Sequence, residues 1–123
     1  MINELSKQIY QNAKDKGFYE DGKANNVGER LCLIHSEVSE ALEAHRIGKR
    51  TTKNMLSVNG WVSDEDFKES FKEGVKDTFE DEIADVMIRC MDTAAHMGFD
   101  LEEHIRAKMR YNSLREKMHG KQY

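Results

Sequence analysis

The sequence predicts an all-α protein with the architecture of a four-helix bundle, and three observations support this prediction. The chain contains no proline, and most of its eight glycines fall between stretches of helical periodicity. Its apolar residues recur at steps of three and four rather than in alternation, which is typical of amphipathic helices. At 123 residues with 38% apolar side chains, the chain is long enough to bury a core. We therefore expect residues 1–123 to form a single domain of packed helices.

The first two predicted helices lie in the first half of the chain. The first covers residues 3–16, and Gly17 is its stop signal. The second begins after Asn26, which we expect to act as its N-cap with Glu29 three residues later, and it ends at Gly48. Its core-facing stripe is expected to consist of Val27, Leu31, Ile34, Val38 and Leu42.

Residues 49–78 form the least regular stretch, and we expect an irregular or partly helical insertion between the second and third bundle helices. Within it, SDEDFKESFKEGV has the pattern of a short helix capped by Ser63. One side of that helix would carry Phe67, Phe71 and Val75.

The third bundle helix is predicted over residues 79–98 and the fourth from its cap at Asp100 to about Met118. The third is so rich in apolar residues that we expect it to be mostly buried. It also carries a narrow ionisable stripe at steps of three and four, formed by Glu82, Asp85, Arg89, Asp92 and His96. Such a stripe is either a solvent-facing edge or a row of side chains pointing into a site. The fourth helix has Leu101, Ile105, Met109 and Leu114 as apolar contacts.

Composition excludes several classes of function. A net charge of -4 gives no reason to expect nucleic-acid binding, and no apolar run approaches the length of a membrane span. The N-terminal MINELSKQIY lacks the apolar stretch of a signal peptide. Cys32 and Cys90 fall on predicted buried helix faces without metal-ligand spacing, as in a reducing compartment. We therefore expect a cytoplasmic protein without a nucleic-acid or membrane partner.

Two pairs of acidic residues stand out because they lie in mid-helix beside apolar arcs. Glu37 and Glu40 are three apart on the second helix, and Glu82 and Asp85 are three apart on the third. A carboxylate on an apolar arc needs a partner, which is either a lysine or arginine or a metal ion. Four carboxylates gathered from two helices would repel one another when empty. An oxygen-only set of this kind favours Mg²⁺ or Mn²⁺ over zinc, and a pair of such ions activates water at phosphorus.

The fourth helix offers groups of the opposite charge. Lys108, Asn112, Arg115 and His119 follow one another at steps of 4, 3 and 4 and would share one helical face. A donor stripe of this kind suits phosphate oxygens, although taken alone it is more typical of a solvated face. A di-iron site would instead need Glu-x-x-His on core helices, and this spacing occurs only at Glu116 and His119 in the tail.

The segments LIHSEVSEALEAHR and EDEIADVMIRCMDTAAHMGFDLEEHIRAKMRYNSLREKMHGKQ together resemble the MazG-like all-α nucleoside-triphosphate pyrophosphohydrolases, and NAKDKGFYED resembles the start of that family. The resemblance implies a MazG-type bundle that assembles as a homodimer or homotetramer. It also implies Mg²⁺-dependent hydrolysis of a nucleoside triphosphate, with Mn²⁺ as a substitute, by metal-activated water at the α-phosphorus. The products are the monophosphate and pyrophosphate. The catalytic metal ligands would be Glu37, Glu40, Glu82 and Asp85, and the substrate-binding residues Lys108, Asn112 and Arg115.

Residues 49–78 depart from the compact bacterial members of this family, so the base pocket is left open. The aromatic side chains considered for stacking on a base are Phe18, Tyr19, His45 and Trp61. Two alternatives remain beside a general nucleotide pyrophosphohydrolase. One is a relative specific for dUTP or dCTP, or for phosphoribosyl-ATP. The other is a non-catalytic helical oligomerisation or regulatory module that binds metal.

Overall fold

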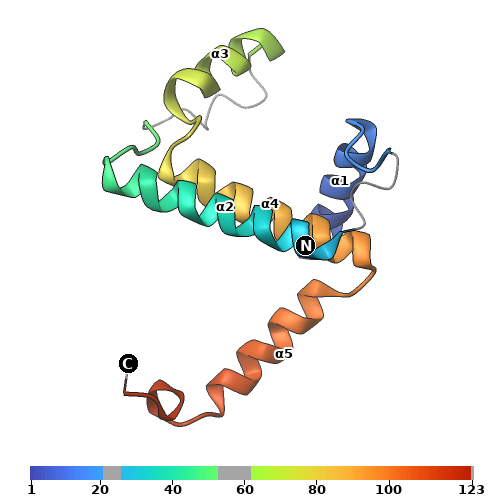
Figure 1. Ribbon diagram of the computed structural model, residues 1–123, viewed down its shortest axis with the longest axis vertical. Helices are drawn as coiled ribbons and strands as arrows, with labels where there is room; N and C mark the ends of the chain where they lie inside the picture. Colours follow the sequence, from blue (N-terminus) through green and yellow to red (C-terminus); the bar gives the residue numbers. More distant parts are fainter. Residues whose placement is uncertain (21–25, 53–61, 123) are drawn as a thin grey trace. The chain divides into compact units, whose positions relative to one another are not determined.

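The computed structural model describes residues 1–20, 26–52 and 62–122, and every regular element in those ranges is a helix. The all-α prediction is confirmed. No helix among the described residues is long and apolar enough to cross a membrane. In chain order (Figure 1) the helices are α1 (Ile2–Asp15), α2 (Val27–Arg46), α3 (Asp64–Gly74), α4 (Phe79–Met97), α5 (Leu101–Ser113) and the short 3₁₀ helix η3 (Lys117–Gly120).

The predicted helix starts are confirmed by their capping contacts. In each case the side-chain oxygen of the N-cap accepts a hydrogen bond from a backbone N–H three residues later, which satisfies a donor that the first turn leaves open. The caps are Asn26 for α2, Ser63 for α3 and Asp100 for α5. The predicted stop signal of α4 is confirmed as well: Gly98 follows its last residue with a φ of 74°, which a residue with a side chain rarely adopts.

The chain divides into two compact units, Met1–Lys23 with Met91–Tyr123 and Ala24–Cys90, and α4 contributes its second half to the former and its first half to the latter. Within Ala24–Cys90, α2 and α4 lie side by side (Figure 1). They run antiparallel, because the ring of His45 near the end of α2 lies 5.7 Å from that of Phe79 at the start of α4.

The buried face of α2 differs from the predicted one. Its buried residues are Glu37, Ala41 and Ala44, which lie on one side of the helix. The large apolar residues that we expected to face the core are exposed instead, with Leu31 and Val38 each 50% accessible. The prediction of the inward stripe is therefore wrong. The small residues allow close contact between helices, and this side of α2 faces α4.

The predictions that α4 is mostly buried and that both cysteines are buried also fail. The reason is that the neighbouring helices cover only part of the surface of α2 and α4. Met91 and Ala94 of α4 are buried, but much of the apolar surface of the helix is exposed, namely Ile83, Met87, Ile88 and Met97. Cys32, predicted to be buried, is exposed, and Cys90 is intermediate.

The insertion contains the short helix that the sequence predicts, here α3. Two contacts join the residues before the insertion's undescribed part to the end of α3 and the turn after it. The N–H of Thr52 donates to the carbonyl of Gly74 at 3.1 Å, and the hydroxyls of Thr51 and Thr78 are 2.9 Å apart. Asp77 links α3 to α4 in the left-handed conformation, with a φ of 62°, and its N–H donates to a carboxylate oxygen of Asp81. The insertion is therefore helical over Asp64–Gly74.

In the unit of Met1–Lys23 and Met91–Tyr123, polar contacts tie α1 to the start of α5. The backbone N–H of Ile2 donates to Oε1 of Glu102 at 3.0 Å, and Nδ2 of Asn3 donates to Asp100 at 2.7 Å. None of the residues of α5 is buried. This helix ends at Ser113 rather than at about Met118, and the prediction of its length is therefore wrong.

Candidate metal centre

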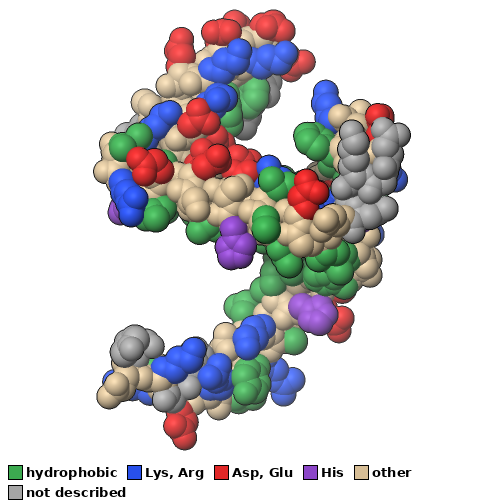
Figure 2. Space-filling model, viewed as in Figure 1, with side chains coloured by type: hydrophobic (Ala, Val, Ile, Leu, Met, Phe, Trp, Pro, Cys, Tyr) green, Lys and Arg blue, Asp and Glu red, His purple; other side chains and the backbone are tan. Residues whose placement is uncertain are grey.

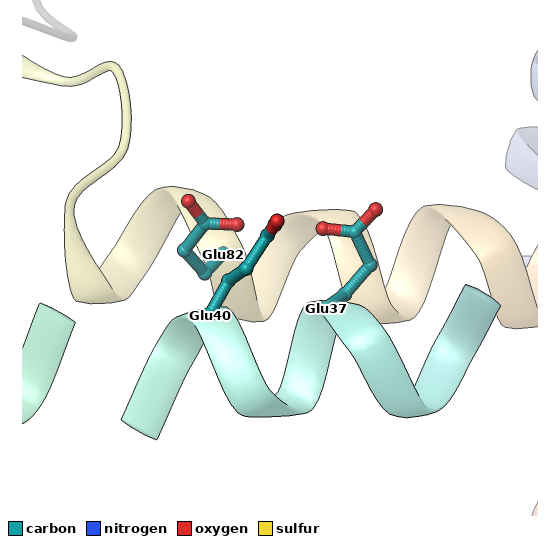
Figure 3. Close-up of side chains that lie close together, drawn as sticks. All are labelled: Glu37, Glu40 and Glu82. Atoms are coloured by element: carbon teal, nitrogen blue, oxygen red, sulfur yellow. The ribbon is translucent and has the colours of Figure 1, made fainter. Parts of the chain in front are cut away.

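Three carboxylates converge between α2 and the first half of α4. Glu37 and Glu40 extend from α2 and Glu82 extends from α4 toward them (Figure 3). Each offers one carboxylate oxygen, and these three oxygens lie within 4.8 Å of one another. Glu37 and Glu82 are 8% and 6% exposed, whereas Glu40 is exposed. The antiparallel pairing therefore brings together three of the four acidic residues that the sequence singled out; we call them the carboxylate group.

Asp85, the fourth of these residues, borders the carboxylate group. It is half-buried on α4, one turn after Glu82. Burial raises the pKa of Asp85, and the negative charges of Asp81 and Glu37 raise it further, while Arg89 opposes the shift. Asp85 therefore lies within the electrostatic field of the group, although it is not one of the three convergent carboxylates.

The pKa of Glu82 is strongly raised. Burial raises its pKa to about 7, with further contributions from the charge of Glu40 and a hydrogen bond with it, and then from Asp85 and Glu37. A carboxyl group with this pKa keeps its proton through much of the range below neutral pH. A bound cation would favour the ionised form and release that proton.

Arg89 supplies a positive charge beside the carboxylates. Its Nε donates a hydrogen bond of 2.6 Å to Oε1 of Glu37. One of the two partners left open by the sequence, an arginine, is thus present for Glu37. This ion pair reaches the carboxylate group from α4. One guanidinium does not balance three convergent carboxylates, so the group retains an excess of negative charge when they are ionised.

The donor set fits a hard divalent cation. The three convergent side chains offer carboxylate oxygens alone, without sulfur or imidazole ligands. Mg²⁺ and Mn²⁺ prefer such ligands, and Mg²⁺ keeps several waters beside one or two carboxylates. The residues able to hold such an ion are Glu37, Glu40 and Glu82, with Asp85 next to them.

The predicted phosphate-binding residues belong to the unit that contains α5. Lys108 and Asn112 lie on α5, and Arg115 follows its end. The Lys108 ammonium is 5.1 Å and the Arg115 guanidinium carbon 5.5 Å from the ring centre of Tyr111. The structure thus gathers the two cations around an aromatic residue that the sequence motifs did not single out. Because α5 ends at Ser113, the helical spacing that we expected does not extend to Arg115.

The second half of the ionisable stripe on α4 has different neighbours. The hydroxyl of Tyr19 donates to Oδ2 of Asp92 at 2.7 Å, and its ring centre lies 4.8 Å from that of His96. The ring of Tyr10 meets that of Tyr19 edge-on at 4.8 Å. The stripe therefore does not serve one site along its whole length: Glu82 belongs to the carboxylate group, whereas Asp92 and His96 contact the tyrosines.

The aromatic residues considered for base stacking lie in different surroundings. Phe18 is 70% exposed, Tyr19 is held by Asp92, and His45 packs against Phe79. Trp61 lies outside the described residues. The base contact of these aromatic side chains therefore stays a prediction.

No protein-family model matches the chain, and no curated protein or solved structure matches it either. The functional proposal therefore depends on the geometry of the carboxylate group and on the sequence motifs that supply it.

Proposed function

We propose that the protein is a Mg²⁺-dependent nucleoside-triphosphate pyrophosphohydrolase of the MazG-like type. The observation that carries the proposal is the convergence of Glu37, Glu40 and Glu82, whose oxygens lie within 4.8 Å of one another across two helices. The substrate is a nucleoside triphosphate, and the products are the monophosphate and pyrophosphate. The two free cysteines, Cys32 and Cys90, fit the reducing conditions of a cytoplasmic enzyme.

The side chains have separate roles in this proposal. Glu37, Glu40, Glu82 and Asp85 hold divalent cations, with Mn²⁺ able to replace Mg²⁺. Bound ions supply charge neutralisation of the triphosphate and activation of the attacking water. Burial of Glu37 and Glu82 strengthens their electrostatic interactions, because the surroundings screen charge less than water does. Lys108, Asn112 and Arg115 bind the phosphates, with arginine suited to bidentate contact.

A homodimer or homotetramer is part of the proposal. The large apolar residues on α2 that do not pack in their own unit support it, since Leu31, Val38 and Leu42 are 50%, 50% and 51% exposed. A row of such residues on one helix is typical of a surface that a partner covers. Replacing Leu42 with glutamate should shift the particle to lower mass in light scattering, whereas the same change at the exposed Leu5 of α1 should not.

A second candidate function is a non-catalytic module that binds metal. The ion pair between Arg89 and Glu37 favours it, because it gives one of the buried glutamates a structural partner. In that case Mg²⁺ would bind without turnover of any nucleotide.

A nucleotide panel tests the proposal. The protein is incubated with Mg²⁺ and each ribo- and deoxyribonucleoside triphosphate, together with phosphoribosyl-ATP, and pyrophosphate release is measured. In ¹⁸O-labelled water, attack at the α-phosphorus places the label in the monophosphate. Label in pyrophosphate would contradict the mechanism, as would a diphosphate product. Mg²⁺ binding without turnover of any member of the panel would instead support the non-catalytic module.

A further inference from the structure

The unit Ala24–Cys90 contains a pocket between α3 and the first turns of α4. Its volume is about 410 Å³, within the range of small-ligand sites. Figure 2 shows basic and acidic side chains over α3 and acidic ones near the start of α4. The α3 side supplies two aromatic rings and two ammonium groups, and the α4 side supplies carboxylates. The side chains that carry the argument are Phe67, Phe71, Lys68, Lys72, Asp81 and Asp85.

Phe67 and Phe71 form the aromatic wall of this pocket. They lie one helical turn apart on α3, so they project on the same side of the helix. Their ring centres are 5.9 Å apart with an angle of 46° between the planes. Both residues are half-buried, which leaves part of each ring accessible to a ligand. The N-cap contact of Ser63 fixes where α3 begins and therefore which residues face the pocket.

The charges around the pocket cancel. Three lysines and three aspartates line it. Lys68 pairs with Glu65 at 3.6 Å and Lys76 with Asp77 at 3.0 Å, while Lys72 forms no ion pair with another described residue. A wall of this composition gives no net attraction for a triphosphate. It suits an uncharged planar group that stacks on the rings, with donors and acceptors at its edge for the ammonium and carboxylate groups.

Asp85 connects the pocket with the carboxylate group. It lines the pocket, and the charges of Glu37 and Glu40 act on its carboxyl group. The two sites are therefore neighbours on the same stretch of α4. We therefore expect a ligand with its phosphates at the carboxylate group to extend past Asp85 toward the aromatic wall.

We propose that this pocket binds the nucleobase of the substrate, with the base stacked on Phe67 and Phe71. The inference rests on the proposed function, because that function assigns the phosphates of the same nucleotide to the carboxylate group. Lys72 and Asp81 offer a donor and an acceptor to the edge of the base. The insertion thereby acquires a role in substrate selection.

The test compares two ligands that differ in the base. Calorimetry measures binding of a non-hydrolysable α,β-imido nucleoside triphosphate and of inorganic tripolyphosphate, each with Mg²⁺. Replacing Phe71 with leucine keeps an apolar side chain and removes the aromatic face. Because stacking of one base contributes on the order of 1–3 kcal/mol, the nucleotide should bind about tenfold more weakly. Binding of tripolyphosphate should stay within twofold. The control is Phe99→Leu, which changes a 43% exposed aromatic residue in the other unit.

Equal weakening of both ligands, or unchanged nucleotide binding in both Phe67→Leu and Phe71→Leu, would overturn the inference. A measurement on the unsubstituted protein does not depend on how the variants fold. Nuclear Overhauser effects should join base protons to the ring protons of Phe67 and Phe71, and their absence in a saturated complex would count against stacking.

Failure of the proposed function can be distinguished from failure of the pocket assignment. If the nucleotide binds here but no triphosphate is hydrolysed, the pocket assignment stands and the catalytic one does not. If the leucine variants turn over the nucleotide and bind it normally, the catalytic assignment stands and the pocket assignment does not.

Discussion

Nε of Arg89 donates a 2.6 Å hydrogen bond to Oε1 of Glu37, so the first half of α4 neutralises a glutamate of α2 whose side chain is 10% exposed. The same glutamate is one of the three convergent carboxylates. In the proposed metal site, a divalent cation and the guanidinium would therefore act on the same carboxylate. Both positive charges would relieve the repulsion among the three carboxylates. The guanidinium and the cation should therefore compete for Glu37, and this competition can be measured.

Replacing Arg89 with glutamine should destabilise the metal-free protein and have little effect once Mg²⁺ is bound. Without metal, Glu37 loses its cationic partner, and we expect a loss of about 1 kcal/mol in the free energy of unfolding. With Mg²⁺ at about a hundred times its dissociation constant, binding stabilises the unsubstituted protein by about 2.7 kcal/mol. The variant should gain about 1 kcal/mol more than this, because no guanidinium opposes the cation at Glu37 and Mg²⁺ therefore binds more tightly. Chemical denaturation with and without Mg²⁺ measures both terms.

Arg50→Gln is the matched control. Arg50 pairs at 2.7 Å with Glu80, which lies on α4 like Arg89 but outside the carboxylate group. Its loss should therefore change stability equally with and without Mg²⁺. An unchanged melting curve of the unsubstituted protein across millimolar Mg²⁺, or a clear preference for zinc, would contradict the predicted metal site.

The raised pKa of Glu82 predicts how stability depends on pH. Its pKa is about 7 in the folded protein, against an ordinary value of 4.5. Between these values the folded protein binds more protons than the unfolded chain, so this residue makes the free energy of unfolding fall as pH rises from about 4.5 to about 7. Below that window the contribution of Glu82 is constant, and above it the full penalty remains.

The difference in stability between the unsubstituted protein and Glu82→Gln isolates this contribution. In metal-free buffer the variant should gain stability relative to the unsubstituted protein as pH rises through the window. Mg²⁺ affinity of the unsubstituted protein should rise over the same range, because binding displaces the Glu82 proton. Calorimetry in two buffers of different ionisation enthalpy measures that proton. A difference that is flat with pH would show that Glu82 titrates normally.

Removing one carboxylate charge should abolish turnover without loss of the fold. We expect Glu40→Gln to lower kcat/KM by at least about a hundredfold, since a ligand of the ions that stabilise the transition state is lost. Glu43→Gln is the control, because Glu43 lies three residues along α2 and pairs at the surface with Arg46 at 3.8 Å. Similar activity in the two variants would exclude a catalytic role for Glu40.

The cations around Tyr111 should affect nucleotide binding and leave metal binding unchanged. Lys108→Ala and Arg115→Ala each remove one charge-assisted contact to phosphate, and we expect a loss of roughly ten- to a hundredfold in kcat/KM. Mg²⁺ binding to the free protein should persist. Arg106→Ala, on an exposed part of α5, is the control. If all three variants behave alike, the residues act through surface charge alone.

The sequence predicted those parts of the fold that local chemistry decides. Asn26, Ser63 and Asp100 were identified as caps because a short polar side chain before a helix bonds to its own first turn, whatever packs nearby. The convergence of Glu37 and Glu40 with Glu82 was also predictable. The first two share one face of α2, Glu82 lies beside the apolar arc of α4, and the two helices could be expected to pack face to face. Asp85 was placed with them and lies at their border.

The misses arise where burial depends on neighbours. Periodicity showed that α2 has an apolar stripe, but not that α4 lies against the side with Ala41 and Ala44. The end of α5 was missed because nothing marks it as strongly as glycine or proline does. Asn112 and Ser113 have low helix propensity, and Ser113 donates to the carbonyl of Arg110 at 2.6 Å, so a helix without buried residues stops there.

If the carboxylate group holds a divalent cation as proposed, the two alanines on the buried face of α2 should affect which ion is selected. Axes of packed helices lie about 8 to 10 Å apart, and small residues at the contact favour the shorter distance. The distance between the axes of α2 and α4 determines the gap that separates the carboxylates of Glu37 and Glu40 from that of Glu82. Mg²⁺ requires oxygens at about 2.0–2.1 Å, whereas Ca²⁺ accepts about 2.3–2.6 Å. A larger side chain at Ala41 would widen the gap and favour the cation with the larger ionic radius. In the proposed site, the methyl group of Ala41 would thereby be a determinant of metal selectivity although it is not itself a metal ligand.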